Sequence, residues 1–441
     1  CEAGGCVVGS DAGTSGGRAT GSVVSATRAH VGIDPTREVP LGCGKNTGGD
    51  WSVADPIEIN MLGLWDETGA PTILISCDLL YPGSVLDQLV DGAFPGVPRE
   101  RVLLGASHTH AAPMADPDKP ALGEIDLEYM ALLKEKFGSA ARALMDESRR
   151  VPVEVRAGSG EADHAVNRRL HRRIRFGKRP WFNRIVFAPN PQGPRDQTVT
   201  TLSLVGPDGS VFAVVWNYAC HPVDYPTPKT VSAHFPGSVR AAIRRRWGRD
   251  VSVLYFQGFS GDTRPRYRTR RTLEATVRRV LQGGAFLSPD VRSYEEWTEG
   301  VAADVLKVVE KSEQIDVSKT TAARDVIPGS AVARPLESGI SFQALRLGDD
   351  LTLVAASAEV VSEYALRLRE TSPTGYLMCV GCTDVTFGYV PTKRMLQEGG
   401  YEAQEYLPHF GLEALSPNVE HVFRSGLEGV LDAASSRDGA A

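Results

Sequence analysis

The sequence contains no apolar run that approaches the roughly 20 residues of a membrane-spanning helix. The longest apolar stretch, around Val211–Trp216, has the length of a β-strand. Basic residues are not in excess either, because 48 lysines and arginines stand against 54 acidic residues and give a net charge of −6. A protein of this charge is poorly suited to wrapping nucleic acid. We therefore expect neither a membrane span nor a nucleic-acid partner.

Cysteine is scarce and odd in number, with seven residues in 441, which excludes a disulfide-stabilised scaffold. Cys379 and Cys382 form a single Cys-x-x-Cys pair, a weak metal or redox motif because no second pair accompanies it. The alternative is that they are two small residues at the end of a buried strand. The sequence begins with Cys1 and a Gly/Ser-rich stretch, so we expect a flexible tail over 1–24. We favour a cytoplasmic protein, with secretion or lipid anchoring through Cys1 as the alternative.

Apolar residues make up 42 % of the chain, which is enough for a sizeable core. Three β-hairpins are predicted, each with a tight polar turn. Their strands are Glu58–Trp65 with Pro71–Ser76, Thr198–Val205 with Val211–Trp216, and Ile340–Leu347 with Leu351–Ala356. Amphipathic stretches beginning near Asp126 and Pro236 predict helices between strands. We expect residues 25–441 to form one large α/β domain with mixed β-sheets and surrounding helices.

Only nine histidines occur, and two of them lie in Ser107-His108-Thr109-His110, directly after a predicted strand. On an extended segment both rings point to one face, because strand side chains alternate. A His-x-His pair of this kind is a common zinc-binding arrangement. A hydrogen-bonded pair in a loop explains it equally well.

Polar residues follow the second strand of each predicted hairpin: Asp78, His221 and Glu359. Enzymes of the α/β class tend to build their sites at such strand ends. Two imidazoles, from His108 and His221, and the Glu359 carboxylate would make a catalytic zinc set with one position left for water. The alternative for Glu359 is the solvated start of a helix, where carboxylates are common.

Other motifs carry weaker signals. The segment Gly258-Phe259-Ser260-Gly261 is one residue shorter than a Gly-x-Ser-x-Gly elbow, so a nucleophilic Ser260 is weakly supported. Two arginine-rich stretches, 167–175 and 264–271, stand out in an acidic chain. Arginine forks suit carboxylate and phosphate groups. A solvated, salt-bridged surface is the commoner explanation of such runs.

Together these residues resemble the catalytic domain of the neutral and alkaline ceramidases and their bacterial relatives. The resemblance covers most of 25–430. In chain order its motifs are Val31–Pro35, Asp55–Ile57, Asp78, Ser107–His110, Asn167–Arg168, Asn217–Pro222, Gln257–Pro265, Tyr389–Thr392 and Gly400–Glu402. No single motif is decisive, but their order and spacing together are specific. We expect no counterpart of the C-terminal immunoglobulin-like domain of true ceramidases after the tyrosine motif.

The resemblance implies a neutral-ceramidase-like fold and an amide hydrolase that uses one Zn²⁺. The zinc ligands it implies are His108, His221, Glu359 and Tyr389. The residues it places on the substrate side, to stabilise an oxyanion or move a proton, are His110, Arg168 and Tyr401. Zinc in such a site polarises the carbonyl and lowers the pKa of its water toward about 7.

The sequence departs from the ceramidases where they handle substrate. Gly258-Phe259 stands in place of a Ser-Asn pair that serves the sphingoid head group, and His234 stands in place of an aspartate. We therefore predict a zinc-dependent hydrolase acting on a smaller, anionic N-acyl substrate, with Arg264 facing it beside Arg168. Arg264 alternatively pairs with Asp262 or another acid.

Two other classes of function remain open at this point. One is a zinc esterase or a tailoring enzyme of small-molecule biosynthesis, which would use the same metal on a different bond. The other is a non-catalytic protein that holds an anion with its arginines. The sequence retains all four implied zinc ligands, which disfavours the non-catalytic protein. The sequence leaves the identity of the small-molecule substrate and the oligomeric state open.

Overall fold

The computed structural model describes residues 24–44, 46–176, 179–267, 286–372 and 374–436. The side chains of residues 173–183 also lie outside the description. The predicted tail, except for its last residue, and Cys1 fall outside the described residues. So do residues 268–271 of the second arginine-rich stretch.

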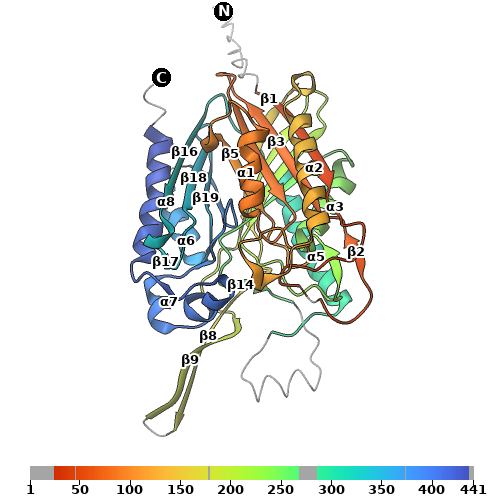
Figure 1. Ribbon diagram of the computed structural model, residues 1–441. Helices are drawn as coiled ribbons and strands as arrows, with labels where there is room; N and C mark the ends of the chain where they lie inside the picture. Colours follow the sequence, from red (N-terminus) through yellow and green to blue (C-terminus); the bar gives the residue numbers. More distant parts are fainter. Residues whose placement is uncertain (1–23, 45, 177–178, 268–285, 373, 437–441) are drawn as a thin grey trace, which may run out of the picture.

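Three sheets built on one plan form the body of the molecule (Figure 1). In each sheet a first strand pairs antiparallel with a hairpin, and a later strand joins the hairpin in parallel. The first sheet contains β1 (Ser25–Gly32), β3 (Glu58–Trp65), β4 (Pro71–Cys77) and β5 (Val102–Ala106). The second contains β7 (Glu154–Glu161), β10 (Thr198–Val205), β11 (Val211–Tyr218) and β13 (Ser252–Gln257). The third contains β16 (Thr320–Ile327), β18 (Ile340–Leu347), β19 (Leu351–Ala356) and β21 (Tyr376–Val380).

The three predicted hairpins are therefore confirmed as β3–β4, β10–β11 and β18–β19. Mixed sheets with surrounding helices also confirm the predicted α/β class.

Helices occupy equivalent places in the three units. One helix connects each hairpin to its parallel strand: α1 (Gly83–Ala93), α3 (His234–Trp247) and α6 (Ser362–Thr371). Another follows the parallel strand and packs on its own sheet: α2 (Leu127–Leu144), α5 (Val291–Glu310) and α8 (Val419–Ser436). Asp126 caps α2 as predicted, accepting a hydrogen bond from the Tyr129 amide. Helix α3 begins at His234, two residues before the predicted Pro236.

One apolar core joins all three sheets. Its members include Leu62, Leu74 and Leu103 from the first sheet, Leu202, Val215 and Leu254 from the second, and Leu345, Leu353 and Met378 from the third. The chain segments that leave these sheets meet at one end of this core. There the Ala106 amide donates to the Cys382 carbonyl at 3.0 Å, and the Gly381 amide donates to the Gln257 carbonyl at 2.9 Å. The candidate site lies at this meeting point.

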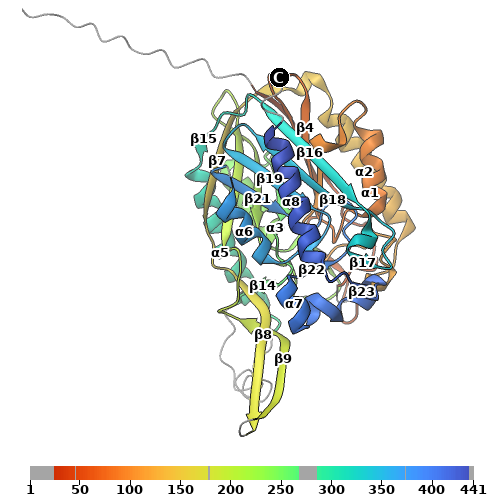
Figure 2. The ribbon, with the colours of Figure 1, turned by 90° about the vertical axis from the view of Figure 1, so that its left-hand side faces the viewer.

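A long antiparallel hairpin, β8 (Ala165–Phe176) and β9 (Arg179–Asn190), projects from the body (Figure 2). Strand β14 (Thr263–Pro265) pairs with the root of β8. The remaining short elements are β2 (Ser52–Asp55), β6 (Val151–Pro152), β12 (Thr230–Ser232), β15 (Glu313–Gln314), β17 (Ala333–Arg334), β20 (Glu359–Val360), β22 (Tyr389–Val390), α7 (Lys393–Glu398) and β23 (Ala414–Leu415). None of the helices in the described ranges has the length and apolar character needed to cross a membrane.

Candidate metal centre and substrate cavity

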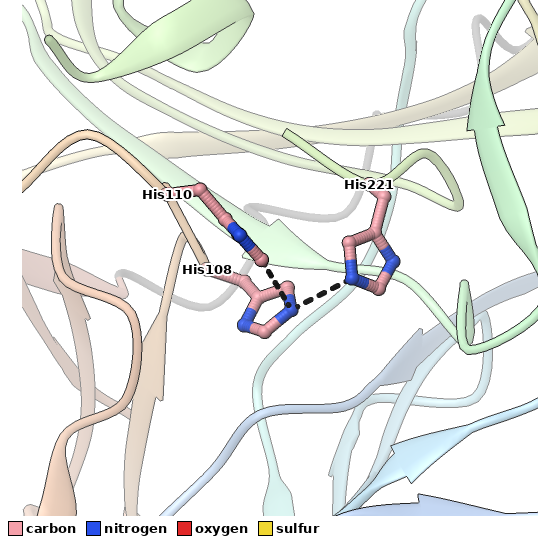
Figure 3. A group of neighbouring side chains, drawn as sticks. All are labelled: His108, His110 and His221. Atoms are coloured by element: carbon pink, nitrogen blue, oxygen red, sulfur yellow. Dashed lines mark hydrogen bonds between the residues drawn. The ribbon is translucent and has the colours of Figure 1, made fainter. Parts of the chain in front are cut away.

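Three histidine rings converge at the end of the core (Figure 3). The Nε2 atoms of His108 and His221 lie 3.0 Å apart, and the Nε2 of His110 lies 3.5 Å from that of His108. Metal–nitrogen bonds of 2.0–2.1 Å in a tetrahedron place ligand atoms about 3.3 Å apart. The spacing of these nitrogens therefore suits a shared metal ion.

The His-x-His segment reaches this arrangement by a turn and not by strand alternation. Strand β5 ends at Ala106, and His108 adopts a left-handed backbone conformation with φ of 63°. Such a conformation is uncommon for residues other than glycine and persists only where the surroundings hold it. The convergence of the rings was predicted, but the extended geometry offered as its cause was wrong.

Backbone carbonyls orient two of the rings. The Nδ1 of His108 donates to the Leu80 carbonyl at 3.0 Å, and the Nδ1 of His221 donates to the Ser260 carbonyl at 3.2 Å. Since a carbonyl oxygen only accepts, each Nδ1 carries a proton, and each Nε2 is directed toward the cluster. This is the support that metal-binding histidines usually receive.

Glu359 completes the cluster from the third sheet. Its Oε2 lies 3.3 Å from the Nε2 of His108 and 3.4 Å from that of His221. The residue is 3 % exposed, and this oxygen finds no hydrogen-bond partner among the described residues. The other oxygen, Oε1, accepts from the Tyr81 hydroxyl at 2.5 Å. A buried, unpartnered carboxylate oxygen beside two imidazoles is the chemistry of a metal ligand, so the solvated-helix alternative for Glu359 does not apply.

Tyr389 lies beside this carboxylate, because β20 and β22 pair in parallel with Glu359 opposite Tyr389. Its hydroxyl interacts with both Glu359 and the Arg168 guanidinium. The ring of Tyr389 also stacks with that of His221 at 6.4 Å between centroids. The structure thus brings the four residues of the implied ligand set together, with His110 next to them.

The cluster is arranged to exchange a proton for a cation. Burial, followed by the nearby positive charge of His108, lowers the pKa of His110 and of His221 well below the usual value. Burial acts in the same sense on His108, but Cys382 and Glu359 outweigh it and raise its pKa well above the usual value. Burial would raise the pKa of Glu359, but His108 outweighs it and the pKa is lowered. Metals bind neutral imidazoles and ionised carboxylates, so a metal ion at this cluster would displace the proton that His108 holds in its absence.

A cavity of about 370 Å³ opens beside the cluster, near the lower end of the range for small-molecule sites. Its walls include His110, His221, Tyr389, Tyr401, Arg168, Arg264, His234 and Lys229. Burial, followed by the negative charge of Glu359, raises the pKa of Tyr401 to about 12, so its hydroxyl stays protonated at neutral pH. The predicted substrate-side residues His110, Arg168 and Tyr401 therefore all face this cavity.

Two arginines line the cavity wall, Arg168 buried and Arg264 half-buried. Arg168 is 3 % exposed and donates from Nε to Glu402 at 2.7 Å, while its Nη2 has no partner in the described part of the chain. Arg264 forms an ion pair with Asp224 at 2.5 Å, and its Nε is likewise unpartnered there. Both guanidinium carbons lie about 5 Å from the Phe187 ring centroid, at 5.0 and 5.2 Å. The alternative offered for Arg264, an ion pair with Asp262 or another acid, is found with Asp224, and Arg264 also lines the cavity.

Other predicted residues have structural roles. Asp78 pairs with Arg240 at 2.6 Å and accepts from the Glu58 amide, so it lies apart from the cluster. The Ser260 hydroxyl is engaged by Gln257, in keeping with its weak claim as a nucleophile.

The two residues of the Cys-x-x-Cys pair lie in different surroundings. Cys379 is buried in β21, and burial raises its pKa to about 12. Cys382 is also buried, and it contacts His108. Each is a free thiol.

Three residues of the site were missed or left open by the sequence. Tyr81 belonged to no motif, and Glu402 lay in the Gly400–Glu402 motif without an assigned role, because each acts on a residue from another part of the chain. His234 was noted without a role. It is 1 % exposed, faces the cavity, and has its pKa lowered to about 3 by burial.

The fold and the site define a mixed α/β protein with a buried cluster of candidate metal ligands at the mouth of a small cavity. Among solved structures, the fold is similar to neutral ceramidase from Pseudomonas aeruginosa. The TM-score is 0.73 at 14 % identity, over 94 % of this chain and 75 % of the ceramidase chain. A structure described as ceramidase complexed with C2 gives a TM-score of 0.71 at 13 % identity, over 94 % and 76 % of the two chains. The chain thus has a neutral-ceramidase-like fold, as the sequence motifs predicted.

No protein-family model matches the sequence, and a search of curated proteins finds no match either. The likeness to the ceramidases is therefore a likeness of fold.

Proposed function

We propose that this protein is a zinc-dependent hydrolase that cleaves the amide C–N bond of a small, anionic N-acyl substrate. The observation that carries the proposal is the unpartnered Oε2 of Glu359, held 3.3 and 3.4 Å from two imidazole nitrogens at the edge of the cavity. The ligands would be His108, His221, Glu359 and Tyr389. Zinc bound there supplies the positive charge that polarises an amide carbonyl and activates water.

Residues of the cavity wall would do the remaining work. His110 lines the cavity next to the cluster, so it is placed to take a proton from the attacking water and return it to the leaving amine. Tyr401 keeps its proton and can donate a hydrogen bond to the developing oxyanion. Arg168 adds a fixed positive charge, because Glu402 holds its Nε and leaves Nη2 free to donate.

The substrate class follows from the same wall. Arg168 Nη2 and Arg264 Nε are buried donors that lack acceptors within the described structure, and both arginines flank Phe187. A carboxylate on the substrate would satisfy both nitrogens. The modest cavity volume favours a smaller molecule than ceramide.

Matched substrates test this proposal. We expect zinc-loaded protein to hydrolyse N-hexanoylglycine with a kcat/KM about 10–100-fold above that for neutral N-hexanoylpropylamine, since a hydrogen bond to a charged group contributes about 1.5–3 kcal/mol. Arg264→Gln should remove most of this preference. Arg266→Gln is the matched control, because Arg266 pairs with Asp163 outside the cavity and should leave the preference unchanged. Equal turnover of the two amides by the wild type would refute an anionic substrate. Turnover of a corresponding hexanoyl ester, with no turnover of either amide, would indicate an esterase.

A further inference from the structure

The three sheets make the same turn after their hairpins. In each, the second residue beyond the hairpin donates its backbone N–H to the last strand carbonyl, at 2.9, 3.2 and 2.8 Å in the first, second and third sheet. The residue that follows this turn is Leu80 in the first sheet, His221 in the second and Glu359 in the third. Two sheets thus place a candidate metal ligand at this position, and the first places a leucine.

The first sheet instead supplies two supporting contacts from consecutive residues. The Leu80 carbonyl accepts from His108, and the Tyr81 hydroxyl donates to the Oε1 of Glu359 at 2.5 Å. Tyr81 is 2 % exposed, so water does not compete for this hydrogen bond. Its ring is held between the His108 ring, 5.2 Å away, and Phe410, 6.3 Å away.

The contact with Tyr81 fixes the orientation of the Glu359 carboxylate relative to the histidines. The terminal torsion of a glutamate is broad, so Glu359 needs an external contact to fix its carboxylate plane. With Oε1 engaged by Tyr81, Oε2 is the oxygen that lies beside both Nε2 atoms. A hydrogen bond to the charged form also stabilises the ionised carboxylate that a metal requires.

We propose that Tyr81 is a positioning residue of the metal centre, which holds Glu359 in the orientation that binds zinc. The inference rests on the proposed function only in that the cluster binds a metal. Outer partners of this kind typically change metal affinity by about 10–100-fold. Tyr81 donates to Oε1, whereas Oε2 makes the contacts of this carboxylate with His108 and His221, so Tyr81 acts through Glu359.

Zinc affinity measured by competition with a chromophoric chelator tests the proposal without any substrate. We expect Tyr81→Phe to weaken zinc binding about 10–100-fold. Tyr364→Phe is the matched control, since it also removes a buried hydroxyl with one hydrogen bond, to the Pro391 carbonyl at 3.1 Å. It should leave zinc affinity unchanged. Tyr81→Leu is a second variant without the hydroxyl, for use if Tyr81→Phe does not fold.

A double variant separates positioning from general loosening of the site. Because Tyr81 acts through Glu359, adding Tyr81→Phe to Glu359→Gln should weaken zinc binding no further than Glu359→Gln alone. Wild-type affinity in Tyr81→Phe, or equal losses in the Tyr81 and Tyr364 variants, would overturn the proposal while leaving the metal centre intact. If the wild type itself binds no zinc, the proposed function fails and this inference fails with it.

Discussion

At the scale of single residues, chemistry depends on protonation states that burial sets. Tyr401 keeps its proton because burial and the charge of Glu359 raise its pKa to about 12. His110 and His221 lose theirs because burial lowers their pKa values. A protonated hydroxyl and two neutral imidazoles therefore line the same cavity at neutral pH.

Tyr401→Phe tests the role of that donor. We expect kcat to fall about 10–100-fold while zinc content and KM change little, since the lost hydrogen bond forms mainly in the transition state. Steady-state kinetics and elemental analysis on the same preparation measure both. A variant with wild-type kcat would remove Tyr401 from the mechanism.

The sequence identified residues that carry a recognisable chemistry and missed those that support them. His108, His221 and Glu359 stood out because imidazole and carboxylate groups after strand ends are a pattern typical of metal sites. Tyr81 gave no signal, since a tyrosine after a strand is ordinarily a core residue. Its hydrogen bond to Glu359 joins positions 278 residues apart, and no local pattern encodes such a contact.

At the scale of elements, hairpins were predictable and the close approach of their loops was not. Apolar strands around Gly- and Asp-rich turns encode β3–β4, β10–β11 and β18–β19 locally. The conformation of the loop after β13 depends on contacts with residues that are far away in the sequence. A Cβ built on Gly258 would lie 2.7 Å from the Ala219 backbone, two residues before His221.

Gly258→Ala should therefore disturb the metal centre from outside it. We expect this variant to be destabilised by about 1–3 kcal/mol and to bind zinc more weakly. The reason is that the new Cβ would meet backbone atoms, which cannot move aside as easily as a flexible side chain. Gly92→Ala is the matched control. A Cβ at Gly92, in α1, meets nothing within 4 Å, so alanine should stabilise the helix by about 0.5–1 kcal/mol. Urea unfolding with zinc titration measures both variants, and a Gly258→Ala protein as stable as the wild type would contradict the packing argument.

At the scale of the whole molecule, three units of one plan surround a common core, and each sends loops to the site. The sequence predicted the hairpins of this plan but not its repetition. The units differ in length and carry unrelated insertions, such as the β8–β9 hairpin in the second. The units are equivalent in their strand pairing and in a repeated backbone turn. Many different sequences can form both features, so the repetition leaves no recognisable sequence pattern.

The repeated plan also explains the composition of the site. Loops at the same end of the three units bring together side chains that are far apart in sequence. His108 and His110 come from the first unit, His221 from the second and Glu359 from the third. Our central claim is that side chains from the three units together bind one metal ion.

Metal content measured together with activity tests that claim most directly. We predict about one zinc per chain in the purified wild type, loss of N-acyl amide hydrolysis on chelation, and recovery on adding zinc back. His221→Ala should hold no zinc and show no recovery, since it removes the ligand supplied by the second unit. Active wild-type protein with no bound metal, or a His221→Ala variant that retains one zinc per chain, would contradict the account.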